Sequence, residues 1–238
     1  MRYTRQIILP EFGVLNQEKL RNAKVLIIGC GGLGTPISTE LAAMGIGSLQ
    51  LMDGDCIEME NLHRQFHFNP DELGKNKAET LSQKLSEQNP EIQVEGIPKP
   101  IRFPEDNYRI QQTDLVIDTC DDLSSRISIS QACYELQKPL FYAAASGWKG
   151  MIMAQIPKTQ FNLSERLKET EPLTCNETGI FPPVLFWVSS LITTEVIRYI
   201  TNGFTQLEHK FEIFDALQFK HQTFQLNNYA KSYTEAKF

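Results

Sequence analysis

The amino-acid sequence predicts an α/β protein with a Rossmann-like, mostly parallel sheet that helices cover, extended by antiparallel strands in the C-terminal half. Residues 24–29 and 114–118 are apolar runs without alternation, which is typical of strands buried on both faces. A glycine-rich turn follows the first run and leads into a helical pattern at residues 33–44. A second apolar run at residues 48–53 completes one unit of strand, helix and strand.

The next elements repeat this order. Residues 74–89 have the pattern of a charged amphipathic helix that Pro90 closes, and residues 123–136 have that of another helix. Further strands are expected at residues 92–97 and 140–144.

The pattern changes after Gly150. Strands are expected at residues 151–156, 210–214 and 219–225, with one long apolar helix at residues 183–201. We expect part of this half to extend the sheet in antiparallel fashion.

Two segments have no clear periodicity. Residues 157–181 are polar and turn-rich and contain Cys175, which predicts a mobile loop of functional size and a candidate lid. Residues 228–238 are polar enough to form a frayed tail.

The composition excludes several classes of protein. The chain has 238 residues, 41% hydrophobic and 22% charged, with a formal net charge of −6. This fits one enlarged domain over residues 1–238. The acidic balance argues against nucleic acid as a partner, because phosphate recognition needs a concentrated basic face. Neither a signal peptide nor a stretch approaching the length of a membrane span is recognisable, so we expect a cytoplasmic protein without a membrane partner.

The five cysteines are scattered, and none belongs to a CxxC pair. An odd number without pairs argues against both a disulfide framework and a thiolate zinc site.

The glycine-rich turn fits the pattern GxGxxG. Its glycines allow a tight turn and a close approach to a phosphate, while the amides of the helix N-terminus attract the phosphate charge. Asp53 ends the next strand, where a carboxylate accepts hydrogen bonds from ribose hydroxyls. Together they predict a site for an adenosine nucleotide, and they leave open whether that is a dinucleotide or ATP. The four glycines are Gly29, Gly31, Gly32 and Gly34.

Charged and amide side chains follow the second strand. A dehydrogenase has no need of such a cation cluster. Transfer of an AMP group does, because the charge on the leaving phosphates must be met by Arg or Lys and a metal ion. The residues concerned are Asp55, Asn61, Arg64, Gln65 and Lys77.

Two neighbouring acids follow the strand at residues 114–118. Asp121 is the candidate ligand for Mg²⁺, which prefers hard oxygen ligands. Asp122 stands directly before a predicted helix and is expected to cap it.

These motifs, together with residues 2–9 and 173–175, resemble the adenylyltransferases that activate ubiquitin-like sulfur carriers in molybdopterin and thiazole synthesis, relatives of the ubiquitin-activating enzymes. The resemblance covers nearly the whole chain. It implies that ATP and Mg²⁺ are used to join the C-terminal Gly-Gly carboxylate of a carrier protein to AMP. It divides the chain into a nucleotide-binding part, about residues 1–150, and a carrier-binding and loop part, about residues 151–238.

The resemblance also implies roles for single residues. A homodimer is expected, in which Arg5 of one subunit completes the ATP pocket of the other. Asn61, Arg64 and Lys77 address the triphosphate, and Asp121 binds Mg²⁺. Cys175 aligns with a family cysteine that takes part in thioester or persulfide chemistry, although no neighbouring cation lowers its pKa.

The sequence departs from the family in two places. The two CxxC pairs that bind a structural zinc in many members are missing at residues 160–163 and 231–238, so zinc is not expected. The sequence also ends without a rhodanese-like extension, so we expect a separate sulfur donor.

Three alternatives stay open. One is an enzyme of the same fold that activates a carboxylate on a modified tRNA base, of the threonylcarbamoyladenosine dehydratase type. The second is an NAD-dependent dehydrogenase, which leaves Arg5, Arg64 and Lys77 without a task. The third is a silent scaffold that docks a small partner.

Overall fold

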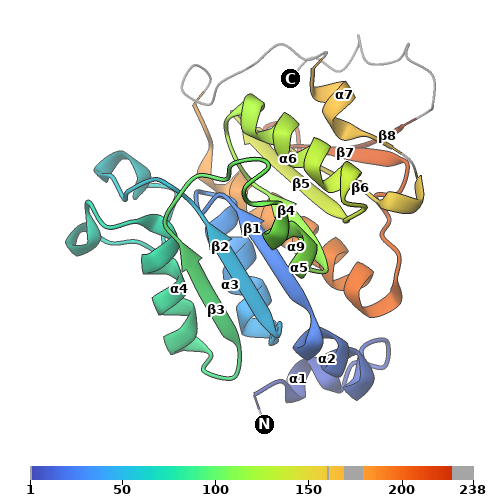
Figure 1. Cartoon of the computed structure of the whole chain (residues 1–238), viewed down its shortest axis with the longest axis horizontal. Coiled ribbons are helices and arrows are strands. Elements are labelled where there is room, and N and C mark those ends of the chain that lie inside the picture. Colours follow the sequence, from blue (N-terminus) through green and yellow to red (C-terminus); the bar gives the residue numbers. More distant parts are fainter. Residues whose placement is uncertain (1, 160, 169–178, 227–238) are drawn as a thin grey trace.

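In the computed structural model, which describes residues 2–159, 161–168 and 179–226, one eight-stranded sheet has the order β3-β2-β1-β4-β5-β6-β7-β8 (Figure 1). The strands are β1 Lys24–Ile28, β2 Ser48–Met52, β3 Gln93–Ile97, β4 Leu115–Asp118, β5 Leu140–Ser146, β6 Lys149–Gln155, β7 Lys210–Asp215 and β8 Lys220–Gln225. The helices are α1 Thr4–Ile7, α2 Gly13–Asn22, α3 Gly34–Met44, α4 Lys77–Gln88, α5 Asn107–Gln112, α6 Leu123–Glu135, α7 Leu163–Leu167 and α9 Pro182–Asn202. Short 3₁₀ helices are η1 Met59–Asn61, η2 Pro70–Glu72 and η3 Pro157–Thr159.

β1 lies between β2 and β4 and pairs with both in parallel. Ile28 is opposite Met52 on one side and Asp118 on the other. β3 and β5 extend this parallel part at its two ends. The strand order reverses between β1 and β4, and open α/β sheets bind their ligands at the carboxyl edge of such a switch point. The prediction of a mostly parallel sheet is confirmed.

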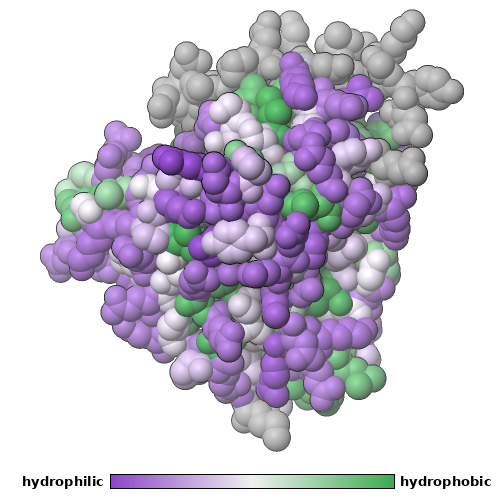
Figure 2. All heavy atoms as spheres, viewed as in Figure 1, coloured by the Kyte–Doolittle hydropathy of each residue, from purple (hydrophilic) through white to green (hydrophobic). Residues whose placement is uncertain are grey.

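Helices cover both faces of the sheet and form two apolar cores. α3, α4 and α9 pack on one face, where Ile37, Leu81 and Val188 are buried. α5 and α6 cover the other face, where Ile110 and Ile129 are buried. Figure 1 shows α6 in front of the sheet, and hydrophilic residues predominate on the same side in Figure 2. This burial explains the unbroken apolar runs of the central strands.

The C-terminal half continues the sheet with antiparallel pairs, as predicted. β6 pairs with β5, β7 with β6 and β8 with β7, all in antiparallel orientation. α9 lies close against this part of the sheet, because a Cβ on Gly150 would lie 2.0 Å from Cγ2 of Val188.

α9 corrects one expectation. It is long and apolar enough to cross a membrane, with a mean hydropathy of 1.3 over its most apolar window. The expectation that no stretch approaches the length of a membrane span is therefore wrong, because α9 has both the length and the apolar composition. Half of that window is buried inside the protein, where α9 packs against α3, β5 and β6. Its apolar character here is that of a core helix.

Part of the predicted loop at residues 157–181 is helical. η3 and α7 lie within it, and Leu163 and Leu167 of α7 are buried. Asn162 caps α7 by accepting the Ser164 N–H at 3.1 Å. The prediction failed because one apolar pair at a spacing of four gives too short a pattern to identify a helix. Cys175 and the predicted tail at residues 228–238 lie outside the described residues.

Candidate active site

The glycine loop at residues 29–34 joins the end of β1 to the start of α3. Gly29 has a φ of 98°, a left-handed value that favours glycine. A Cβ on Gly34 would lie 1.9 Å from the carbonyl oxygen of Gly29, and one on Gly32 would lie 2.7 Å from Cδ1 of Leu185 in α9. The loop therefore requires glycine at positions 29 and 34, whereas a side chain at position 32 would only displace the end of the Leu185 side chain.

Gly31 differs from the other three. A Cβ there would meet only Nε2 of Gln65, at an ordinary contact distance of 3.6 Å. Gln65 is buried, and its Oε1 has no hydrogen-bond partner in the described part of the chain. The fold does not need a glycine at position 31, whereas a loop that approaches a phosphate closely does. Glycine at position 31 is therefore explained by the approach of a phosphate and not by the packing of the chain.

Asp53 fixes the glycine loop to the end of β2. Its Oδ2 accepts the Cys30 N–H at 2.6 Å, and its Oδ1 accepts the Asp55 N–H at 2.8 Å. Burial raises the pKa of the Asp53 carboxyl, although these two N–H donors and the charge of Lys77 act in the opposite direction. Each oxygen keeps a further lone pair for a ribose hydroxyl, so the predicted contact with ribose is compatible with this second task.

Lys77 is the first residue of α4, and its side chain is only 8% exposed. Nζ lies 2.9 Å from Oδ2 of Asp55, a carboxylate that is 74% exposed. The preceding residue, Asn76, caps α4 by accepting the Glu79 N–H at 3.0 Å. The fold therefore brings a cation from the start of α4 to the carboxyl edge of β2, beside Asp53.

Asn61 and Arg64 lie in the segment that follows β2. Asn61 ends η1, is buried, and accepts the Glu58 N–H through Oδ1 at 3.3 Å. Nη1 of Arg64 donates to the Glu60 carbonyl at 2.8 Å and contacts His63 Nε2. Arg64 has no carboxylate partner within the residues that the structure describes. It is a cation available to an anionic ligand.

Asp121 and Asp122 have different environments at the end of β4. Asp122 accepts the Ser125 N–H at 2.7 Å and the Ser124 N–H at 3.4 Å, and these bonds lower its pKa. It is the N-cap of α6, as expected. Asp121 is exposed, and none of the described residues forms a hydrogen bond or ion pair with it. Asp121 is thus the free carboxylate at this edge.

Asp121 is one carboxylate, and a metal site built from protein side chains alone needs more ligands than that. Residues 2–159, 161–168 and 179–226 hold no group of three or more His, Cys, Asp or Glu side chains that could bind a metal. Mg²⁺ in nucleotide sites is usually held by one or two carboxylates together with the substrate phosphates. A single free carboxylate beside the glycine loop fits that kind of binding.

A buried ion pair lies behind Asp121 and was not found from the sequence. Asp118 is fully buried at the end of β4, and its Oδ2 lies 3.6 Å from Nη1 of Arg126 in α6. Nη2 of Arg126 donates to the Ala143 carbonyl at 3.1 Å, and its guanidinium lies over the Tyr142 ring at 4.3 Å. The pair links α6 to β4 and β5. The two charges are eight residues apart in the sequence. One belongs to a strand and the other to a helix, so no periodic pattern predicts that they pair.

Arg5 does not join these residues within one subunit. It is exposed on α1, whose Gln6 donates to the Met44 carbonyl at 2.8 Å, at the C-terminal end of α3. The glycine loop lies at the other end of the same helix, which has eleven residues and is about 16 Å long. α1, which contains Arg5, therefore lies at the opposite edge of the sheet from the glycine loop (Figure 1).

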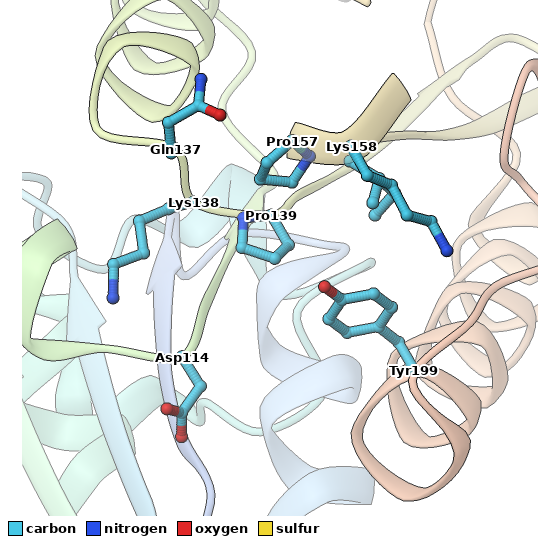
Figure 3. Close-up of a pocket in the computed structure, with 8 residues that line it drawn as sticks. Asp114, Gln137, Lys138, Pro139, Pro157, Lys158 and Tyr199 are labelled. Atoms are coloured by element: carbon cyan, nitrogen blue, oxygen red, sulfur yellow. The ribbon is translucent and has the colours of Figure 1, made fainter. Parts of the chain in front are cut away.

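The pocket drawn in Figure 3 also lies away from the site. Its volume is about 360 Å³, and it is lined by Asp114, Lys138, Lys158 and Tyr199 at the amino ends of β4 and β5. Lys138 donates to the Thr113 carbonyl and Lys158 pairs with Glu208, so both cations are satisfied within the chain. It belongs to the other edge of the sheet.

Comparison with known proteins identifies the family of the chain. The ThiF family model matches residues 3–235. The sulfur carrier protein ThiS adenylyltransferase of Escherichia coli K12 is 33% identical over 204 residues, which are 84% of this chain and 81% of that protein. The molybdopterin-synthase adenylyltransferase of the same organism is 32% identical over 220 residues, 91% of this chain and 88% of that protein.

Longer relatives and solved structures agree with these matches. The adenylyltransferase and sulfurtransferase MOCS3 of Dictyostelium discoideum is 35% identical over 85% of this chain, which spans about half of that protein, 48%. The crystal structure of E. coli MccB with ATP superposes with a TM-score of 0.81 at 27% identity, covering 95% of this chain and 71% of MccB. The chain belongs to the ThiF family and is an adenylyltransferase.

Proposed function

We propose that this adenylyltransferase joins the C-terminal Gly-Gly carboxylate of a ubiquitin-like sulfur-carrier protein to AMP, with ATP as the donor. The pathway would be the biosynthesis of thiamin or of the molybdenum cofactor. The observation that carries the proposal is the set of groups at one edge of the sheet. The glycine loop, which Asp53 holds, and Lys77 lie at the carboxyl edge of β1 and β2. Arg64 follows β2 and Asp121 follows β4 in the sequence. The names of the relatives support the carrier protein as substrate.

In the proposed reaction a carboxylate oxygen of the carrier attacks the α-phosphorus of ATP. The bond from that phosphorus to the bridging oxygen of the β-phosphate breaks, and pyrophosphate leaves. Arg64 and Lys77 meet the charge on the leaving phosphates, while the amides of the glycine loop hold a phosphate at the start of α3. Asp121 would hold Mg²⁺, which neutralises phosphate charge when bound. Catalysis then rests on positioning and charge neutralisation and needs no protein nucleophile.

Three further expectations belong to the proposal. Arg5 acts on the site of a second subunit, since it lies at the far edge of its own sheet beside exposed apolar residues such as Ile8 and Leu9, which are 62% and 53% exposed. Cys175 acts after adenylation, in sulfur or thioester transfer. The protein works in the cytoplasm as one domain.

The proposal is tested by exchange of labelled pyrophosphate into ATP, with and without small carrier proteins that end in Gly-Gly. We expect exchange that depends on a carrier and is lost in Asp121→Asn. Asp71→Asn is the matched control, because Asp71 is an exposed acid in η2, outside the site. Absence of exchange with every carrier, in a folded protein that binds ATP, would overturn the carrier as substrate. NAD binding, or exchange driven by a modified tRNA, would favour one of the two alternative enzymes.

A further inference from the structure

Asn76 uses every polar group of its side chain. Oδ1 accepts the Glu79 N–H at 3.0 Å and so caps α4. Nδ2 donates to the carbonyl of Asp53 at 3.0 Å and to that of Asp55 at 3.1 Å. A side-chain amide has two N–H donors, and both are used here on the segment that follows β2.

The two carbonyls bound by Asn76 belong to residues that hold the candidate site together. The Asp53 carboxylate binds the Cys30 amide in the glycine loop at 2.6 Å. Asp55 binds Lys77 twice, since its carbonyl accepts the Lys77 N–H at 3.0 Å and its Oδ2 lies 2.9 Å from Nζ. Asn76 therefore connects the start of α4 with the segment that positions both the glycine loop and Lys77.

Capping alone does not explain an asparagine here. Ser, Thr and Asp cap helices as well as Asn, because a cap needs only an acceptor. Asn69 shows the simpler case. It caps η2 by accepting the Asp71 N–H at 3.0 Å, and its Nδ2 donates to none of the residues that the structure describes. Asn76 differs from Asn69 in the two donated bonds that run toward the site.

We infer that Asn76 is a positioning residue for nucleotide binding, which fixes Lys77 relative to the glycine loop through its two bonds to the Asp53 and Asp55 carbonyls. This inference rests on the proposed function. All polar groups of the Asn76 side chain are bonded within the chain, so Asn76 acts through Lys77 and Asp53. Loss of the two donated bonds leaves α4 capped but frees the Lys77 ammonium to take several positions. The nucleotide must then order the ammonium when it binds, and the entropy cost of this ordering weakens binding.

Two substitutions separate the cap from the donated bonds. Asn76→Asp keeps an acceptor for the Glu79 N–H and adds a negative charge at a helix N-terminus, which is favourable. It replaces both N–H donors with an oxygen that faces two carbonyls. Asn76→Ser keeps the cap and removes the donors without adding charge. Asn69→Asp makes the same chemical change at a cap that lacks the donated bonds.

The experiment measures the thermal midpoint, the Kd for ATP without carrier, and the KM for ATP and kcat of pyrophosphate exchange. We expect both Asn76 variants to unfold within a few degrees of the wild type, to bind ATP about tenfold more weakly and to show a raised KM for ATP. Asn69→Asp should match the wild type in all these quantities. In a Lys77→Met background, Asn76→Asp should have little further effect, because the two residues act as one unit.

Each result decides one question. Wild-type affinity for ATP in both Asn76 variants would overturn the inference and leave the proposed function intact. A defect in Asn76→Asp alone would assign the effect to the added charge and also overturn it. A defect that adds fully to that of Lys77→Met would show that Asn76 does not act through Lys77. Binding of ATP without a carrier tests the inference even if no carrier supports exchange. Failure of the inference about Asn76 can therefore be told apart from failure of the proposed function.

Discussion

The α-carbon of Gly34 faces the carbonyl oxygen of Gly29 so closely that a Cβ on Gly34 would lie 1.9 Å from it. This contact closes the turn from β1 into α3. Gly31, two residues after Gly29, has no such contact, because its Cβ would meet only the Gln65 side chain at 3.6 Å. Gly34 is therefore needed for the fold of the loop. Gly31 is not, and its lack of a side chain leaves room for a ligand.

Alanine at these two positions should separate folding from binding. Gly34→Ala should lower the free energy of unfolding by about 3 kcal/mol or more, because backbone atoms must move apart. Gly31→Ala should leave the thermal midpoint within a few degrees of the wild type but weaken ATP binding at least tenfold, since its methyl group occupies the space proposed for a phosphate. Thermal denaturation and ATP titration measure both. Unchanged ATP affinity in Gly31→Ala would contradict the proposed position of the phosphates.

The extent to which sequence predicts this fold depends on the length of each pattern. β1, α3 and β2 are identified because an apolar run, a glycine-rich turn, a helical repeat and a second apolar run follow one another over residues 24–52. α1, α2 and α5 have no such pattern. α2, for example, buries only Gln17 and Leu20. A short helix that buries two side chains gives too little periodicity to be found.

The site follows a similar rule. The glycines and Asp53 are found because a motif places them at fixed spacing along the chain. The contribution of Asn76 depends on carbonyl groups 21 and 23 residues earlier, and every residue has a carbonyl. Backbone partners give no signal in a sequence. The pairing of Asp118 with Arg126 likewise requires the packing of α6 on β4 to be known.

Loss of Arg126 should destabilise the protein strongly. The Asp118 carboxylate is fully buried, and burial raises the pKa of this group while the Arg126 charge opposes that effect. Arg126→Met leaves the carboxylate without its counter-charge, at a cost of about 3–5 kcal/mol in the free energy of unfolding. Chemical denaturation at pH 7 measures this cost. Adding Asp118→Asn, which still accepts the Cys120 N–H, should recover part of it. A double variant no more stable than Arg126→Met would argue against the uncompensated charge as the cause.

His67 should make the stability depend on pH. Burial, and then the charge of Lys84, lowers the pKa of this imidazole, and its Nε2 contacts Thr39 Oγ1 at 2.8 Å. The unfolded chain takes up a proton on His67 near pH 6.5, whereas the folded chain resists it until lower pH. The contribution of His67 to stability is therefore full above about pH 6.5 and is lost as the pH falls toward and through the folded pKa. Denaturant titrations between pH 7.5 and 5.5 should show a shallower pH dependence in His67→Gln than in the wild type. Equal slopes would exclude His67 as the source.

The placement of Arg5 gives a prediction about assembly. Arg5 lies beside the C-terminal end of α3, and Asp121 follows β4 at the opposite edge of the sheet. If Arg5 completes the site of a second subunit, Arg5→Ala and Asp121→Asn should each be inactive alone. In a mixed dimer the subunit with Arg5→Ala keeps its own Asp121 and receives an intact Arg5 from its partner. One of the two sites of the mixed dimer therefore has every group.

Mixing the two inactive variants should therefore restore activity. With random exchange of subunits, half of the dimers are mixed and one site in each is intact, which gives about one quarter of the wild-type rate of pyrophosphate exchange. The subunits must be exchanged by co-expression or by refolding together, and the mass of the complex measured by light scattering. A mixture of Asp121→Asn with Asp121→Ala is the control, because no combination of these subunits rebuilds a site. Failure of Arg5→Ala and Asp121→Asn to complement each other, in dimers shown to be mixed, would place the action of Arg5 within its own subunit or outside the reaction.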